Sequence, residues 1–160
     1  MKVLLQDIKK LATEALIVGF FEDVRPLKGL AGELDWLLCG SLSNLILKKK
    51  LRGSLGEVAL MTSQGKIPTQ KIFLVGLGPK ESFSSSALRS VANTVSTSAL
   101  GAGVAKAAIE FFKPPALSYD RSMSAFSEGL SQGAEGRSFD VTILVSDSAV
   151  YEKIAPLVKH

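Results

Sequence analysis

The chain has 160 residues, of which 46% are hydrophobic and 21% charged, and its formal net charge is +4. This length is typical of one domain, and the globular composition excludes a long disordered segment. The single cysteine excludes an intrachain disulfide, and no apolar run reaches the ~18 residues of a membrane span or has the pattern of a signal peptide. We therefore expect one cytoplasmic domain, residues 1–160, with no membrane partner.

The first half of the chain alternates between strand-length apolar runs and helical spacing. Residues 2–6 and 14–21 are strand candidates, and the second run is apolar enough to be buried on both faces. Leucines recur at helical spacing and predict one amphipathic helix over residues 30–47. Cys39 falls within it, where a buried structural thiol is the usual state. Residues 57–63 then form a further strand candidate.

The second half continues the alternation. It begins with a very apolar strand at 71–78, and Ser82 or Ser84 can cap the helix after it. The glycines at 101–103 end that helix. The elements predicted beyond them are a buried strand at 104–112, a helix whose apolar stripe runs from Tyr119 to Leu130, a strand at 139–146, and a closing helix at 150–157 capped by Ser146 or Asp147.

About six strands interleaved with four helices indicate an α/β fold. Strands that alternate with helices favour a mostly parallel sheet covered by helices on both faces. No internal repeat, low-complexity tract or linker divides the chain.

The segment "VGLGPKE" has the order of a nucleotide-binding loop, in which an apolar strand meets Gly76, Leu77 and Gly78 and a helix follows. A dinucleotide fingerprint needs a third glycine, where this chain has Glu81, and a P-loop needs a different lysine spacing. Gly76 and Gly78 are thus candidates for cofactor binding, although a strand-ending turn explains them better.

Other chemistry has little support. The lone histidine, His160, is the last residue, and one His with one Cys cannot assemble a zinc site of the usual kind. The acidic pairs at 21–23 and 33–35 are explained more simply as solvated surface, although 21–23 follows a buried strand at the edge where α/β folds bind ligands. The serine clusters are explained by caps and loops. We predict no catalytic residue, no metal and no cofactor.

Several segments, in their order, resemble one family. They are the strand at Leu16 to Asp23, the Gly-Glu-Leu-Asp at Gly32 to Asp35, the Lys/Gly-rich turn and Gly-Glu at Lys48 to Glu57, the strand end at Val75 to Glu81, and Leu88 to Arg89. Together they resemble the N-terminal domain of the M17 leucyl aminopeptidases, over about Lys2 to Ser146. The resemblance implies a macro-domain-like, three-layer α/β/α sandwich with a mixed, mostly parallel sheet of about six strands.

The resemblance also implies that the family's catalytic domain is absent from these 160 residues. The family's metal ions, catalytic lysine and arginine belong to a C-terminal domain around an Asn-Thr-Asp-Ala-Glu-Gly-Arg motif. The "GAEGRS" at residues 133–138 matches only the end of that motif, which we interpret as coincidence. The chain is therefore identified as similar to the non-catalytic domain, without the catalytic one.

This leads to a non-enzymatic function in protein–protein contact, oligomerisation or regulation, with a protein partner or a second copy of the chain. One alternative is a macro-like module that binds a nucleotide or ADP-ribose. Another is a fragment of a full-length metallo-aminopeptidase. Nucleic-acid binding is a weaker hypothesis, based on the basic run Lys48 to Arg52, which contains no aromatic residue and would predict salt-sensitive binding.

Overall fold

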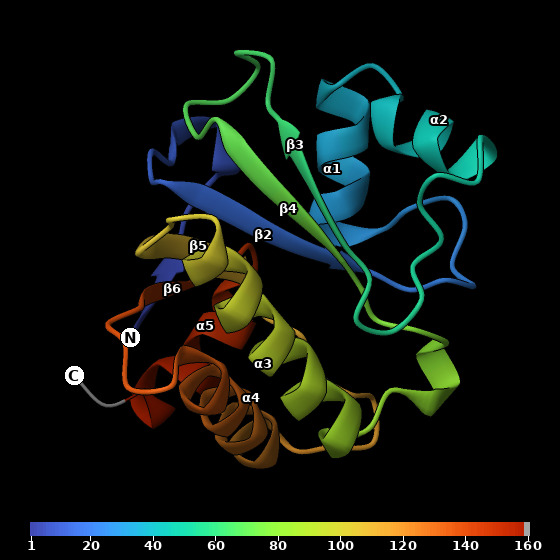
Figure 1. Ribbon diagram of the computed structural model, residues 1–160. Coiled ribbons are helices and arrows are strands. Elements are labelled where there is room, and N and C mark those ends of the chain that lie inside the picture. The colour runs from blue at the N-terminus through green and yellow to red at the C-terminus, as the bar shows by residue number, and fades with distance from the viewer. Residues whose placement is uncertain (159–160) are drawn as a thin grey trace.

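A six-stranded mixed sheet forms the middle layer of the computed structural model, which describes residues 1–158 (Figure 1). The strand order is β1-β6-β5-β2-β4-β3, and all neighbours are parallel except β3 and β4. The strands are β1 (Lys2–Leu5), β2 (Ala15–Phe20), β3 (Val58–Thr62), β4 (Lys71–Gly76), β5 (Lys106–Glu110) and β6 (Asp140–Val145).

Helices cover both faces of this sheet. In Figure 1, α1 and α2 lie on one side, and α3, α4 and α5 lie on the other. Their bounds are α1 (Gly29–Leu37), α2 (Ser41–Leu47), α3 (Ser85–Gly101), α4 (Tyr119–Ala134) and α5 (Ser148–Ile154). Short 3-10 turns are η1 (Ile8–Lys10), η2 (Lys80–Ser82) and η3 (Ala155–Leu157). The predicted three-layer α/β/α class is confirmed.

The core is split into two layers by the central strands. Every residue of β2 is buried, as its unbroken apolar run predicted. Ile17 packs into the layer with Leu88 of α3 and Phe126 of α4, whereas Leu16 packs into the layer with Leu34 of α1. Successive side chains of a strand point to opposite faces, so one strand contributes to both layers.

The predicted single helix over residues 30–47 is wrong, because the chain breaks it into α1 and α2. Cys39 and Gly40 adopt left-handed φ angles of 56° and 80°, which end the first helix. The Asp35 carboxylate then accepts a hydrogen bond from the Ser43 N–H at 3.0 Å, near the start of α2. The leucine spacing correctly predicts that each segment is helical, but it cannot predict the turn between the two helices.

Cys39 is also exposed, not buried as predicted, because it lies at this corner.

Within residues 1–158, no single helix is long and apolar enough to cross a membrane, and α1 and α2 pass that test only as a pair bent by 104°.

The predicted capping residues of α3 and α5 are confirmed. Ser84, not Ser82, caps α3 by accepting a hydrogen bond from the Ala87 N–H at 3.2 Å. Asp147 caps α5 through the Ala149 N–H at 2.8 Å. These side chains satisfy backbone donors that have no partner within the helix.

Candidate functional site

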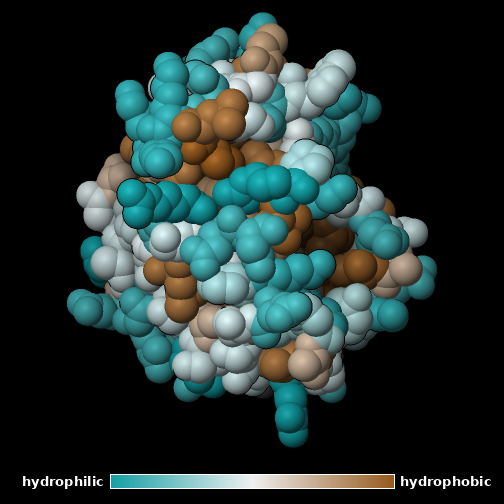
Figure 2. Space-filling view, turned by 90° about the vertical axis from the view of Figure 1, so that its right-hand side faces the viewer, coloured by the Kyte–Doolittle hydropathy of each residue, from teal (hydrophilic) through white to brown (hydrophobic). Residues whose placement is uncertain are grey.

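The carboxyl ends of β2 and β5 frame a pocket at one edge of the sheet. These strands are parallel neighbours, yet the chain continues from β2 to α1 on one face and from β5 to α4 on the other. Open α/β sheets commonly bind ligands at such a reversal. The pocket has a volume of about 240 Å³. Figure 2, which looks onto this edge, shows hydrophobic side chains inside a hollow framed by hydrophilic ones.

Most of the pocket wall is aromatic or aliphatic. Phe20 and Phe21 come from the end of β2, Phe112 follows β5, and Leu77 follows β4. Phe83 completes this wall and meets Phe21 edge to face, with ring centroids 5.4 Å apart. The apolar wall therefore brings together three chain segments that are distant in the sequence.

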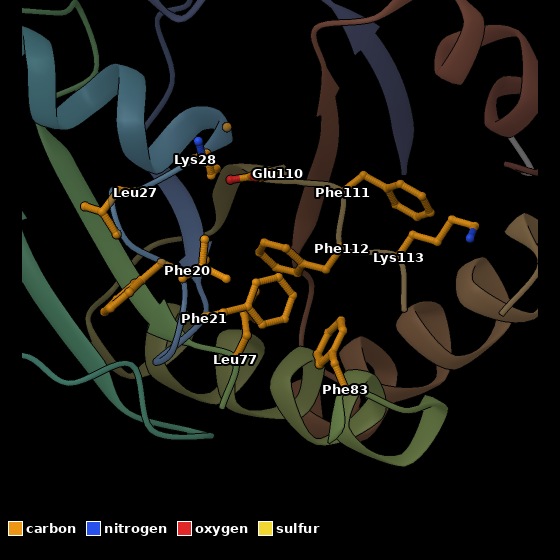
Figure 3. A pocket seen from close by; sticks show the side chains of 13 residues that line it. Phe20, Phe21, Leu27, Lys28, Leu77, Phe83, Glu110, Phe111, Phe112 and Lys113 are labelled. Carbon is orange, nitrogen blue, oxygen red and sulfur yellow. The ribbon is translucent and has the colours of Figure 1, made fainter. Parts of the chain in front are cut away.

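Glu110, the last residue of β5, adds a carboxyl group to this wall (Figure 3). The residue as a whole is half-buried, but its Oε2 atom is inaccessible to solvent and has no hydrogen-bond partner. Burial raises the pKa of Glu110 to about 8, although backbone hydrogen bonds from Gly19 and Leu30 oppose the shift. Leu30 lies in the first turn of α1, so the carboxyl group occupies the start of that helix.

Two lysines border the pocket, and they point differently. The Lys113 Nζ lies 5.3 Å from the centroid of the Tyr119 ring and donates to the Pro114 carbonyl at 3.3 Å. It thus points away from the apolar wall, whereas Lys28 lines the same pocket as Glu110. An adjoining hollow of about 310 Å³ shares Glu110 and Lys113 and is also lined by Asp147.

Sequence reasoning noted residues 21–23 at the ligand-binding edge after a buried strand, and Phe21 does line this pocket, but it did not select Glu110, Phe83 or Phe112. A signal was available, because "KAAIEFF" places one acidic residue at the end of a buried apolar strand. Periodicity treats such a residue as the strand boundary, and only the fold places Glu110 against the start of α1.

The sequence candidates Gly76 and Gly78 lie beside this pocket, in a backbone corner. The N–H groups of Gly76, Leu77 and Gly78 donate to the carbonyls of Glu57, Phe20 and Gly53 at 2.8, 3.0 and 2.9 Å. Gly78 has a φ of +73°, and a Cβ on Gly76 would collide with the Ser54 carbonyl. Glycine is needed here for a turn and a close approach.

One carboxylate of each acidic pair accepts a hydrogen bond from the backbone. Asp23 accepts a hydrogen bond from the Lys80 N–H at 3.1 Å, and Asp35 accepts one from Ser43 as described above. Within residues 1–158, no three His, Cys, Asp or Glu side chains are grouped to hold a metal ion. His160 lies outside the described residues.

The helices α1 and α2 expose large apolar side chains elsewhere on the surface. Trp36 in α1 and Leu47 at the end of α2 are each 81% exposed. Lys48 to Lys50, the start of the basic run, are exposed directly after α2. Cations at a helix C-terminus complement its dipole, which accounts for the position of this run.

The sequence has recognisable relatives. Residues 17–136 match the family described as "Cytosol aminopeptidase family, N-terminal domain". A probable cytosol aminopeptidase of Geobacter sulfurreducens is 34% identical over 132 residues, which cover 79% of this chain and 25% of the relative. One of a Cyanothece species is 40% identical over 88 residues, covering 55% and 18%. The chain thus spans a quarter or less of these relatives.

Solved structures with the same fold include an aminopeptidase and a macrodomain. A tomato leucine aminopeptidase mutant aligns with a TM-score of 0.69 and 23% identity, covering 91% of this chain and 32% of that one. A Trypanosoma brucei macrodomain in complex with ADP-ribose aligns with a TM-score of 0.75 and 13% identity, covering 98% and 68%. At these identities the likeness concerns the fold alone. The family match over residues 17–136 is decisive, and the chain belongs to the cytosol aminopeptidase family through its N-terminal domain.

Proposed function

We propose that the chain is a non-catalytic contact domain of a cytosol aminopeptidase-type protein in the cytoplasm. Its function is protein–protein contact, in oligomer formation or in regulation. The family match supports this proposal, because it covers the N-terminal domain and only a quarter or less of the relatives.

The observation that carries the proposal is the exposure of Trp36 at 81%, with Leu47 equally exposed. Large aromatic side chains contribute strongly to protein interfaces, where tryptophan is enriched among the residues that dominate binding. Burying either side chain against a partner would gain roughly 1.5–3 kcal/mol. The partner is a second copy of the chain or another chain of the aminopeptidase type.

Sedimentation velocity over a wide concentration range tests the contact function. The unmodified chain is expected to sediment faster as its concentration rises, and Trp36→Glu is expected to remain monomeric. Tyr151→Glu is a suitable control, because Tyr151 is 36% exposed but lies in α5, on the opposite face of the sheet. A chain that stays monomeric throughout would contradict self-association, and equal effects of both variants would contradict the role of Trp36.

An activity assay tests the non-catalytic part. The purified chain is expected not to hydrolyse leucine p-nitroanilide in the presence of Mn²⁺ or Zn²⁺. Turnover by the chain would instead favour the alternative that it represents a metallo-aminopeptidase.

A second candidate function is macro-like ligand binding, favoured by the pocket at the ends of β2 and β5. The solved macrodomain with ADP-ribose shares this fold. Titration calorimetry with ADP-ribose and related nucleotides measures such binding, and the absence of heat with every nucleotide would remove this candidate.

A further inference from the structure

The strand β3 leaves one side of its backbone without a partner. It is the last strand in the sheet order, and in Figure 1 no strand lies beyond it. In an antiparallel pair, residues alternate between bonding to the neighbouring strand and pointing away from it. The Gly76 N–H of β4 donates to the Glu57 carbonyl, just before β3. The Ser63 N–H, just after β3, donates to the Gln70 carbonyl. By the register of this ladder, the backbone groups that point outward are those of Val58, Leu60 and Thr62.

The sequence of β3 does not protect this open edge. Its five residues, "VALMT", include no charged residue and no proline, which are common means of preventing edge-to-edge pairing. Leu60 at the centre of the strand is 53% exposed, and Leu55 just before the strand is 48% exposed. The strand at the other edge, β1, begins with Lys2. The β3 edge is therefore the one suited to pairing with a further strand.

The strand is complementary to a second copy of itself. When two β3 strands meet antiparallel with their Leu60 residues opposite each other, Val58 of each copy lies opposite Thr62 of the other. All three outward-facing residues then form hydrogen-bonded pairs, so each outward N–H and C=O gains a partner. No like charges face each other along the strand, which favours contact at this edge between copies that each carry a net charge of +4.

The symmetry of this pairing places equivalent layers side by side. Its twofold axis passes between the two Leu60 residues, perpendicular to the joined sheet, so the same surface is used on both copies. Ala59 and Met61 pack against the core layer under α1 and α2, and that layer of one copy meets the same layer of the other. The exposed Trp36 and Leu47 belong to these two helices.

We propose that two copies of the chain join through their β3 strands, antiparallel about Leu60, into one continuous sheet. Backbone hydrogen bonds supply most of the recognition, and the two Leu60 side chains meet at the centre. This deepens the contact function and rests on it, because pairing of five-residue strands is marginal by itself and needs the apolar contacts of α1 and α2.

A lysine at the centre of the strand tests the pairing. Leu60→Lys places two ammonium groups on opposite residues and is expected to raise the dissociation constant of the dimer at least about tenfold. Sedimentation equilibrium measures this constant, and circular dichroism confirms that the variant is folded. Leu5→Lys is the matched control, because Leu5 is 44% exposed and lies in β1, at the opposite edge of the sheet.

Disulfide cross-linking tests the register, in a Cys39→Ser background because Cys39 is exposed. Leu60→Cys is expected to link two copies in an oxidising glutathione buffer. Opposite residues of a hydrogen-bonded pair have Cα atoms about 5.5 Å apart, within the roughly 4.4–6.8 Å that a disulfide spans. Thr62→Cys is expected not to link with itself, because the two Thr62 residues are roughly 13 Å apart along the paired strands. A mixture of Val58→Cys and Thr62→Cys chains is expected to link.

Three outcomes would overturn the pairing through β3. They are the absence of cross-linking by Leu60→Cys, equally rapid cross-linking by Thr62→Cys alone, and equal dissociation constants for Leu60→Lys and Leu5→Lys. Each of them leaves the unmodified chain self-associating and Trp36→Glu monomeric, so the contact function would stand. A chain that is monomeric at every concentration would instead contradict self-association itself, and with it the pairing of two copies.

Discussion

Glu110 combines a solvent-inaccessible carboxyl oxygen with a pKa raised to about 8, compared with 4.5 for an unperturbed glutamate. At pH values between 4.5 and about 8, the Glu110 carboxyl group keeps its proton in the native state and has lost it in the unfolded state. The contribution of Glu110 to the free energy of unfolding is therefore greatest below pH 4.5 and declines as pH rises to about 8.

Glu110→Gln should abolish that decline, because glutamine does not titrate. The difference in unfolding free energy between Glu110→Gln and the unmodified chain is expected to shift in favour of the variant, by up to about 1.4 kcal/mol per pH unit. Urea unfolding at several pH values between 4.5 and 8 measures it. A difference that stays constant over this range, or one reproduced by Glu81→Gln, would contradict the burial argument.

Gly76 and Gly78, at the end of β4, show what the "VGLG" motif could and could not predict. "VGLG" identified a real corner, and Gly78 has the positive φ that a turn glycine provides. The pattern could not show that the N–H groups of Gly76 and Gly78 donate to Glu57 and Gly53, because those partners belong to another segment.

At the scale of elements, the start of α3 depends on one serine. Ser84→Ala removes the acceptor for the Ala87 N–H and is expected to cost about 1 kcal/mol of stability. Ser82→Ala is the comparison, since Ser82 lies in η2 and does not cap α3. Thermal or urea unfolding should rank the two variants in that order, and the reverse order would assign the cap to Ser82.

The packing of α4 on α3 depends on small residues at their contact. A Cβ on Gly129 would collide with the Arg89 carbonyl, and the Ser96 hydroxyl donates to the Leu130 carbonyl at 2.8 Å across the same contact. Gly129→Ala is therefore expected to destabilise the protein by about 1–3 kcal/mol, because the helices must move apart.

Gly101→Ala is the control for this substitution. Gly101 is the last residue of α3, and a Cβ there meets nothing within 4 Å. Alanine has the higher helix propensity, so this variant is expected to be neutral or slightly stabilising in urea unfolding. Equal destabilisation by both variants would show that the close approach of α3 and α4 is not the cause.

The division of the predicted helix at residues 30–47 follows from a conflict at the same scale. Apolar spacing favours continuation, whereas Cys39 and Gly40 turn the chain through left-handed φ angles. Glycine signals such a stop, but a positive φ at cysteine has no sequence signature. The corner lets Leu34 of α1 and Leu42 of α2 both pack into the core layer between these helices and the sheet.

At the scale of the whole molecule, we propose that residues 1–160 behave as one domain. The two core layers share the central strands, so neither can lose its packing without exposing the other. Methyl signals of Ile109 in one layer and Ile72 in the other are expected to disappear at the same urea concentration by NMR. Two separate midpoints would indicate that the helices of one face unfold independently.

The sequence by itself determined the α/β class, six strands, the caps of α3 and α5, and the family. These features depend on local periodicity, capping residues and short ordered motifs, which one segment carries without the rest of the chain. Only the tertiary structure decided the strand order, the exposure of Cys39 and the pocket at the ends of β2 and β5. Phe21, Phe83 and Glu110 meet there because parallel strands align their carboxyl ends, and no local pattern encodes contacts between residues so distant in the chain.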